Sequence, residues 1–171
     1  EVLRHLEAEG LVESDGHQGP VVATLTADQA AQIYEIRALL EGHAARTCAE
    51  KASPAAIKRL VALNAAIQAD FKAGNFQEVL RRTTAFYEAL FSEAGLTMAW
   101  EVVQSLNARI NRLRVMTISS PGRNIEAAAE MNRIVQALQK RDPQAAQQAS
   151  QEHVQRVAQI AAERLRESGV A

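Results

Sequence analysis

The segment TADQAAQIYEIRALLEGHAARTCAEK, residues 26–51, decides the fold class of this chain. It begins with Thr26 and has Gln29 three positions later, a capping box in which each side chain hydrogen-bonds to the other residue's backbone N–H. Ile33, Arg37, Leu40 and Ala44 follow at three- and four-residue steps, the spacing of one helix face. The pattern therefore predicts a single long helix that runs to about Lys51.

Similar start signals divide the rest of the chain into five further helices. Ser53-Pro54 and Asp142-Pro143 each supply an N-cap followed by a proline at the first helical position. Asn75 and Glu78 form a second capping box. The expected ranges are 53–72, 75–93, 97–119, 124–139 and 142–167. Six helices with short connections predict an all-α antiparallel bundle over residues 26–171.

Residues 1–25 follow a different pattern. Residues 1–9 predict an amphipathic helix with Val2, Leu3 and Leu6 on its apolar side. Two β-prone runs, 11–14 and 20–23, flank a glycine-containing turn and predict a small hairpin. We therefore expect two units, a helix with a hairpin in residues 1–25 and the helical bundle in residues 26–171.

The composition is that of a globular helical protein. Of the 171 residues 47% are hydrophobic and 23% charged, and prolines and glycines lie mostly between the periodic segments. No apolar run is long enough to cross a bilayer, so a cytoplasmic protein without membrane contact is expected. The single cysteine, Cys48, is expected to be a small core residue. The net charge of −1 gives no sign of nucleic-acid binding, and residues 1–25 hold five acidic residues against one arginine, Arg4.

Five unusual side chains fall on otherwise apolar helix faces: Arg37, Thr83, Tyr87, Met131 and His153. They belong to four different predicted helices, and polar groups converging from several helices are how a bundle builds a ligand cavity. Each also has an ordinary structural interpretation. Arg37 can pair with Glu41 one turn later, Thr83 can bond a carbonyl of the preceding turn, Tyr87 and Met131 can fill space, and His153 can be a hydrogen-bonded core residue.

Several motifs together resemble the GntR superfamily of bacterial transcription regulators, in the FadR branch that carries an FCD effector domain. The motifs are EVLRHLEAEGLVE (1–13), LTADQAAQIYEIRALLEGHAAR (25–46), AFYEAL (85–90), INRLRVMTISSPGR (110–123), IVQALQKRDPQAA (134–146) and EHV (152–154). The resemblance covers nearly the whole chain. It implies that residues 1–25 are the C-terminal remnant of a winged helix-turn-helix, with the earlier helices absent, and that residues 26–171 are an effector-binding and dimerisation domain.

The resemblance also addresses metal and DNA binding. Most FCD domains bind a divalent metal through D-x-x-x-H and two later histidines, and the matching positions here are Thr83, Tyr87, Met131 and His153. Only His153 is a good ligand, so we expect no metal and no other cofactor. The candidate DNA contacts are Arg4 and His5 in the recognition-helix remnant and His17 and Gln18 at the wing tip, with solvated side chains as the alternative.

The resemblance implies a ligand-responsive, DNA-binding regulator that forms a homodimer, binds operator DNA through a complete winged helix and is not an enzyme. The expected effector is a small organic carboxylate anchored by Arg37 and oriented by Tyr87 and His153. A rival view keeps Arg37 paired with Glu41 and makes the effector apolar, with Met131 and Phe86 as walls.

Two further classes of function stay open from the sequence. One is a helical-bundle enzyme or effector-binding module that uses Tyr87, His153 and Arg37 as acid–base groups. Against catalysis, the sequence shows no second carboxylate on an inward face, no nucleophile with a base and no phosphate loop. The other is a purely structural helical partner, which leaves the wing-like hairpin unexplained.

Overall fold

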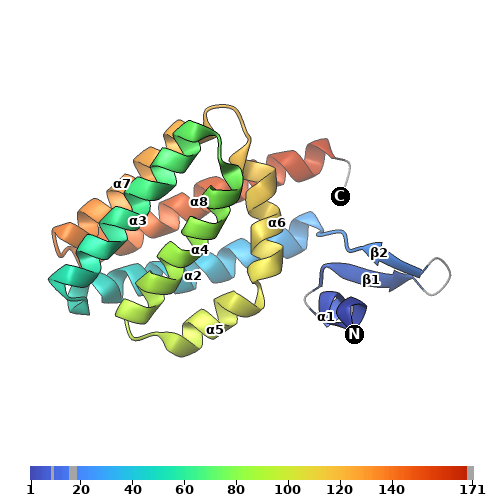
Figure 1. Cartoon of the computed structure of the whole chain (residues 1–171), viewed down its shortest axis with the longest axis horizontal. Coiled ribbons are helices and arrows are strands. Elements are labelled where there is room, and N and C mark those ends of the chain that lie inside the picture. The colour runs from blue at the N-terminus through green and yellow to red at the C-terminus, as the bar shows by residue number, and fades with distance from the viewer. Residues whose placement is uncertain (9, 16–18, 169–171) are drawn as a thin grey trace.

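The computed structural model describes residues 1–8, 10–15 and 19–168. Helices α2 to α8 pack into an antiparallel bundle, and a short helix with a two-stranded hairpin projects from one end (Figure 1). The elements are α1 Val2–Ala8, β1 Val12–Asp15, β2 Gly19–Val22, α2 Ala27–Lys51, α3 Pro54–Ala73, α4 Phe76–Glu93, α5 Thr97–Ser105, α6 Asn107–Ile118, α7 Arg123–Gln139 and α8 Pro143–Glu167. The predicted all-α class is confirmed.

Three of the four predicted helix starts form as expected. In the capping box before α2, Gln29 N–H donates to the Thr26 hydroxyl and Thr26 N–H donates to the Gln29 side chain, each at 3.1 Å. Ser53 and Asp142 cap α3 and α8 in the same way. The capping box predicted at Asn75 is wrong, because its side chain makes no capping bond. The Asn75 backbone N–H donates to the Asp70 carbonyl in α3 instead. The ψ of Asn75 is 72°, whereas Thr26, which does cap its helix, has the extended value of 158°.

The fourth predicted helix is wrong as a single element, so the bundle has seven helices instead of six within the described residues. At Leu106 the backbone turns to φ −99° and ψ −1°, and the Leu106 N–H donates to the Val103 carbonyl three residues earlier. Neither proline nor glycine marks this break, and the apolar periodicity continues through it. The sequence pattern therefore did not indicate the break. Because of this break, α6 leaves the direction of α5 and lies between the bundle and the hairpin (Figure 1).

The core of the bundle is built around α2, whose largest contact is with α8 and which also packs against α4 and α7. Cys48 is fully buried there, as expected, and burial raises the pKa of its thiol to about 11. Between α3 and α7, Asn64 and Gln68 both donate to the Asn132 side-chain oxygen, at 2.9 and 2.7 Å. Among the described residues no helix has the length and apolarity needed to span a bilayer.

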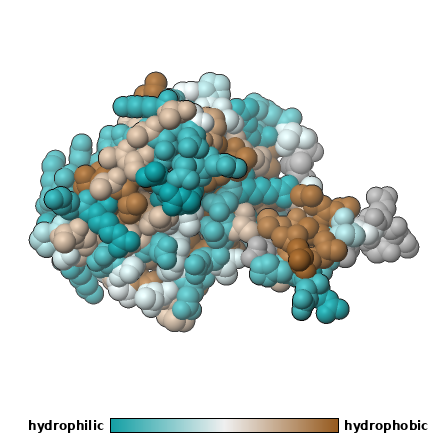
Figure 2. All heavy atoms as spheres, in the orientation of Figure 1, coloured by the Kyte–Doolittle hydropathy of each residue, from teal (hydrophilic) through white to brown (hydrophobic). Residues whose placement is uncertain are grey.

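The N-terminal unit, α1 with the β1–β2 hairpin, is joined to the bundle through α6. Arg112 donates to the Ala23 carbonyl, and the Arg109 guanidinium lies against Gly10. Gly10 has φ +67°, a left-handed backbone conformation that favours glycine, and a Cβ there would displace the end of the Arg109 side chain. The unit exposes Val2, Leu3, Val21 and Val22, and Figure 2 shows a predominantly apolar surface on this unit.

Candidate functional site

A cavity of about 60 Å³ lies inside the bundle, lined by side chains from α2, α3, α4, α6, α7 and α8. The lining residues are Arg37, Ile67, Phe71, Val79, Leu80, Thr83, Arg114, Thr117, Ile118, Arg123, Ala127, Met131, His153 and Val157. The cavity therefore combines several cationic groups with an apolar wall.

The structure brings together four of the five side chains that the sequence singled out. Arg37, Thr83, Met131 and His153 all line this cavity. Tyr87 does not line it; the side chain is buried one layer behind, where the Arg114 guanidinium lies 5.7 Å from the centre of its ring. Four of the five side chains that the sequence singled out therefore share one cavity, and Tyr87 does not.

Arg37 forms the ion pair that was its structural alternative. Its Nε donates to Glu41 Oε1 at 2.7 Å and its Nη2 to Glu41 Oε2 at 3.3 Å, with both side chains at most 2% exposed. Burial lowers the pKa of Arg37, but the Glu41 carboxylate outweighs burial and the net shift is upward, so the guanidinium stays charged. Its Nη1 is buried and has no hydrogen-bond partner among the described residues.

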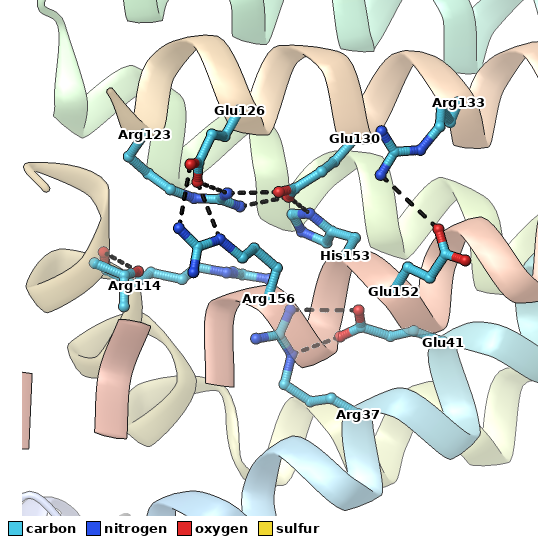
Figure 3. A network of polar contacts seen from close by, with 11 residues as sticks. Arg37, Glu41, Arg114, Arg123, Glu126, Glu130, Arg133, Glu152, His153 and Arg156 are labelled. Carbon is cyan, nitrogen blue, oxygen red and sulfur yellow. Dashed lines mark hydrogen bonds and ion pairs between the residues drawn. The ribbon is translucent and has the colours of Figure 1, made fainter. Parts of the chain in front are cut away.

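His153 belongs to a second buried ion-pair network, with Glu130 and Arg123 (Figure 3). Glu130 accepts two hydrogen bonds from Arg123, at 2.8 and 2.7 Å, and lies 2.6 Å from His153 Nδ1. Burial favours the neutral acid, but these bonds hold the pKa of Glu130 at about 2. Burial lowers the pKa of His153 despite the carboxylate, so the imidazole is neutral at pH 7, with Nδ1–H donating and Nε2 left as an acceptor.

The expectation of no second carboxylate on an inward face is wrong. Glu41 is 0% exposed and Glu130 6% exposed. Glu41 directly follows Leu40 and Glu130 directly precedes Met131, so both lie at the edge of an apolar stripe. A charged residue at such an edge ordinarily faces solvent, and only a partner on the inner side turns it inward.

Arg114 on α6 is the functional candidate that the sequence analysis missed. Its Nη1 donates to the Thr84 hydroxyl at 3.2 Å and to the Asn111 side-chain oxygen at 3.0 Å. Burial and the nearby Arg37 lower the pKa of Arg114 to about 10, which leaves it protonated at neutral pH. The spacing contained a signal, since Arg114 lies four residues after Ile110 and three before Thr117, both buried.

The donor set at the four positions matched to the family's metal ligands does not fit a divalent metal. It consists of the Thr83 hydroxyl, the Tyr87 phenol, the Met131 thioether and the His153 imidazole, whose Nδ1 is already held by Glu130. Burial strongly raises the pKa of Tyr87, which keeps the phenol protonated. Among the described residues no group of three or more His, Cys, Asp or Glu is placed to hold a metal ion.

Two of the four candidate DNA contacts lie in the N-terminal unit as the structure describes it. Arg4 and His5 are exposed on α1. His17 and Gln18 lie outside the described residues. The structure therefore places two of these four residues on the surface.

Comparisons with known proteins agree on the fold. The family model of the FCD domain matches residues 32–156. A relative from Bacillus subtilis (strain 168), described as the uncharacterized HTH-type transcriptional regulator YdhC, is 26% identical over 152 residues, which are 86% of this chain and 66% of that protein. The chain therefore spans just under two thirds of the length of this relative.

Two solved structures superpose on most of the chain. The structure described as E. coli McbR/YncC has a TM-score of 0.81 at 19% identity, over 94% of this chain and 81% of that one. A GntR family member from Pseudomonas syringae pv. tomato str. DC3000 has a TM-score of 0.67 at 22% identity, over 98% of this chain and 70% of that one. At these identities the likeness concerns the fold.

Proposed function

The chain belongs to the FCD domain family of GntR-type regulators, and from this premise we propose that it is part of a ligand-responsive, DNA-binding transcription regulator. Residues 26–171 are the effector-binding and dimerisation domain. Residues 1–25 belong to the winged helix-turn-helix, where Arg4, His5, His17 and Gln18 approach operator DNA. The helix followed by a hairpin in front of the bundle supports this assignment.

The effector is a small organic carboxylate that binds in the bundle cavity without a metal. The observation that carries this proposal is Arg37, which is 2% exposed, lines the cavity and keeps one buried Nη1 donor without a partner. A guanidinium donor in such a place is a ready site for a carboxylate oxygen. Thr83, Met131 and His153 line the rest of the pocket, and Tyr87 supports it from behind.

The test is a calorimetric titration of the purified chain with short carboxylates and with their uncharged amides. We expect at least one carboxylate to bind, and to raise the midpoint of thermal unfolding, while its amide does not. Equal binding of acid and amide would support the rival view of an apolar effector, and no binding by any carboxylate would overturn the proposal. The DNA part is tested by selecting bound sequences from a random DNA library with a protein that carries a complete winged helix. A specific operator is expected, and its affinity is expected to change with the carboxylate.

A homodimer follows from the same proposal, because a two-fold protein matches a two-fold operator. Sedimentation at micromolar concentration is expected to show a dimer, and a monomer alone would contradict it.

An enzyme that uses Arg37, Tyr87 and His153 is the alternative. The two buried carboxylates, Glu41 and Glu130, are each held by an arginine, and burial raises the pKa of Tyr87 beyond the range of a base near pH 7. The bound carboxylate is therefore expected to remain unchanged by NMR during prolonged incubation.

A further inference from the structure

The charges around the bundle cavity do not balance. Three guanidinium groups line it, from Arg37, Arg114 and Arg123. Glu41 neutralises Arg37 and Glu130 neutralises Arg123, at contact distances of 2.7 Å in both pairs. Glu126, which lies 3.6 Å from Arg123, is exposed and hydrogen-bonds to Arg156 at 3.1 and 3.2 Å.

Arg114 is the cation left over. Among the described residues no carboxylate pairs with it, and its hydrogen-bond acceptors, Thr84 and Asn111, are both neutral. The face of the Tyr87 ring, 5.7 Å away, is neutral as well. These contacts are neutral, and the Glu41 carboxylate, which acts on Arg114 at longer range, is in an ion pair with Arg37. The Arg114 guanidinium is partly buried and has no carboxylate in an ion pair with it, so it leaves positive charge at the cavity that favours an anion.

Building on the proposed function, we propose that the effector carries a single negative charge, that it is a short aliphatic monocarboxylate, and that Arg114 binds its carboxylate. Arg37 Nη1 is the second donor, since Nε and Nη2 of Arg37 each already donate a hydrogen bond to Glu41. Arg114 comes from α6, Arg37 from α2, and both side chains point into the space between the helices (Figure 3). The ligand thus replaces the counter-charge that the protein itself lacks.

The rest of the cavity sets the size and polarity of the ligand. Much of the remaining lining is apolar and is formed by Ile67, Phe71, Val79, Leu80, Ile118 and Val157. The small cavity volume of about 60 Å³ favours a short chain. A second carboxylate would find no unpaired cation, because Arg37 and Arg123 are neutralised, so the site discriminates against dicarboxylates.

The test compares butyrate, butyramide and succinate by calorimetric titration of the unaltered chain, and so does not depend on any variant. Butyrate is expected to bind at least about tenfold more tightly than succinate, and butyramide is expected not to bind. Succinate binding as tightly as butyrate would overturn the single-charge inference while leaving a carboxylate effector in place. No binding by either acid would instead overturn the proposed function together with this inference.

A series of variants tests which arginine binds the carboxylate. Arg114→Met is expected to weaken butyrate binding by about 30-fold or more, whereas Arg133→Met, the same change at a half-exposed arginine of α7, is expected to leave it unchanged. Without ligand, Arg114→Met is expected to melt at the same or a higher temperature, because a partly buried charge without an ion-pair partner is removed. Unweakened binding by this variant, or a lower melting temperature without ligand, would show that Arg114 is structural and overturn its assignment.

Discussion

Replacing Arg37 by methionine is expected to destabilise the bundle through the partner that it leaves behind. Glu41 is 0% exposed and its carboxylate is held by Arg37 through hydrogen bonds of 2.7 and 3.3 Å. Without Arg37, an unpaired carboxylate stays in the core, which costs about 3–5 kcal/mol. Since domains are stable by only about 5–15 kcal/mol, the variant loses a large part of its free energy of unfolding. With a urea m-value of about 1–3 kcal/mol/M, the midpoint falls by roughly 1 M or more.

The double variant Arg37→Met/Glu41→Met shows whether the loss of stability comes from breaking the ion pair or from losing both side chains. Replacing both partners of a buried ion pair by apolar residues is often neutral, so its free energy of unfolding is expected to lie within about 1 kcal/mol of the unaltered protein. Equilibrium urea unfolding followed by circular dichroism measures all variants. If the single change cost less than about 1 kcal/mol, or if the effects of the two single changes simply added, the ion pair would not be coupled as its geometry indicates.

The pH dependence of the Arg37→Met variant gives an independent check. An unpaired buried carboxyl has a folded-state pKa above its unfolded value, so the folded state binds the proton more readily. The resulting stability is present below the unfolded pKa and is lost as the pH rises through the folded pKa. The deficit against the unaltered protein is therefore expected to be smaller at pH 5 than at pH 8. A deficit that is constant with pH would refute the unpaired carboxylate as its cause.

Three further outcomes follow from the described contacts. The pKa of Glu130 is about 2 against an ordinary 4.5, so about 3 kcal/mol of stability is present above pH 4.5 and lost as the pH falls to 2. Acid unfolding of Glu130→Gln is expected to lack this component. An unchanged acid-unfolding profile would contradict it. Gly10→Ala forces an alanine into φ +67° against Arg109, at a cost of about 1–2 kcal/mol. Hydrogen exchange is expected to become faster in the β1–β2 hairpin and to stay unchanged in the bundle. Unaltered exchange in the hairpin would argue against this contact. Metal analysis of untagged protein is expected to find no stoichiometric zinc, nickel or manganese, and one tightly held ion per chain would refute metal-free binding.

The sequence determined the helices and most of their starts, because a cap is a local interaction among four residues. Thr26, Ser53 and Asp142 cap their helices as predicted, and the bounds of α2, α3, α4, α7 and α8 differ from the predicted ones by one or two residues. Helical spacing also identified side chains that face inward, and four of the five meet at one cavity. The break at Leu106 was not predictable in this way, because it contains neither glycine nor proline.

Only the tertiary structure decided which charges are compensated. Glu41 lies one turn from Arg37, so that pair was visible in the sequence as an alternative. His153 and Glu130, by contrast, come from different helices, and Arg114 meets Arg37 from positions 77 residues apart in the chain. Periodicity states which face of a helix a side chain occupies and carries no information on the helix that packs against it. Electrostatic compensation depends on distances of a few ångströms between such helices, so the guanidinium of Arg114 at the cavity is recognised as unneutralised only once the bundle is assembled.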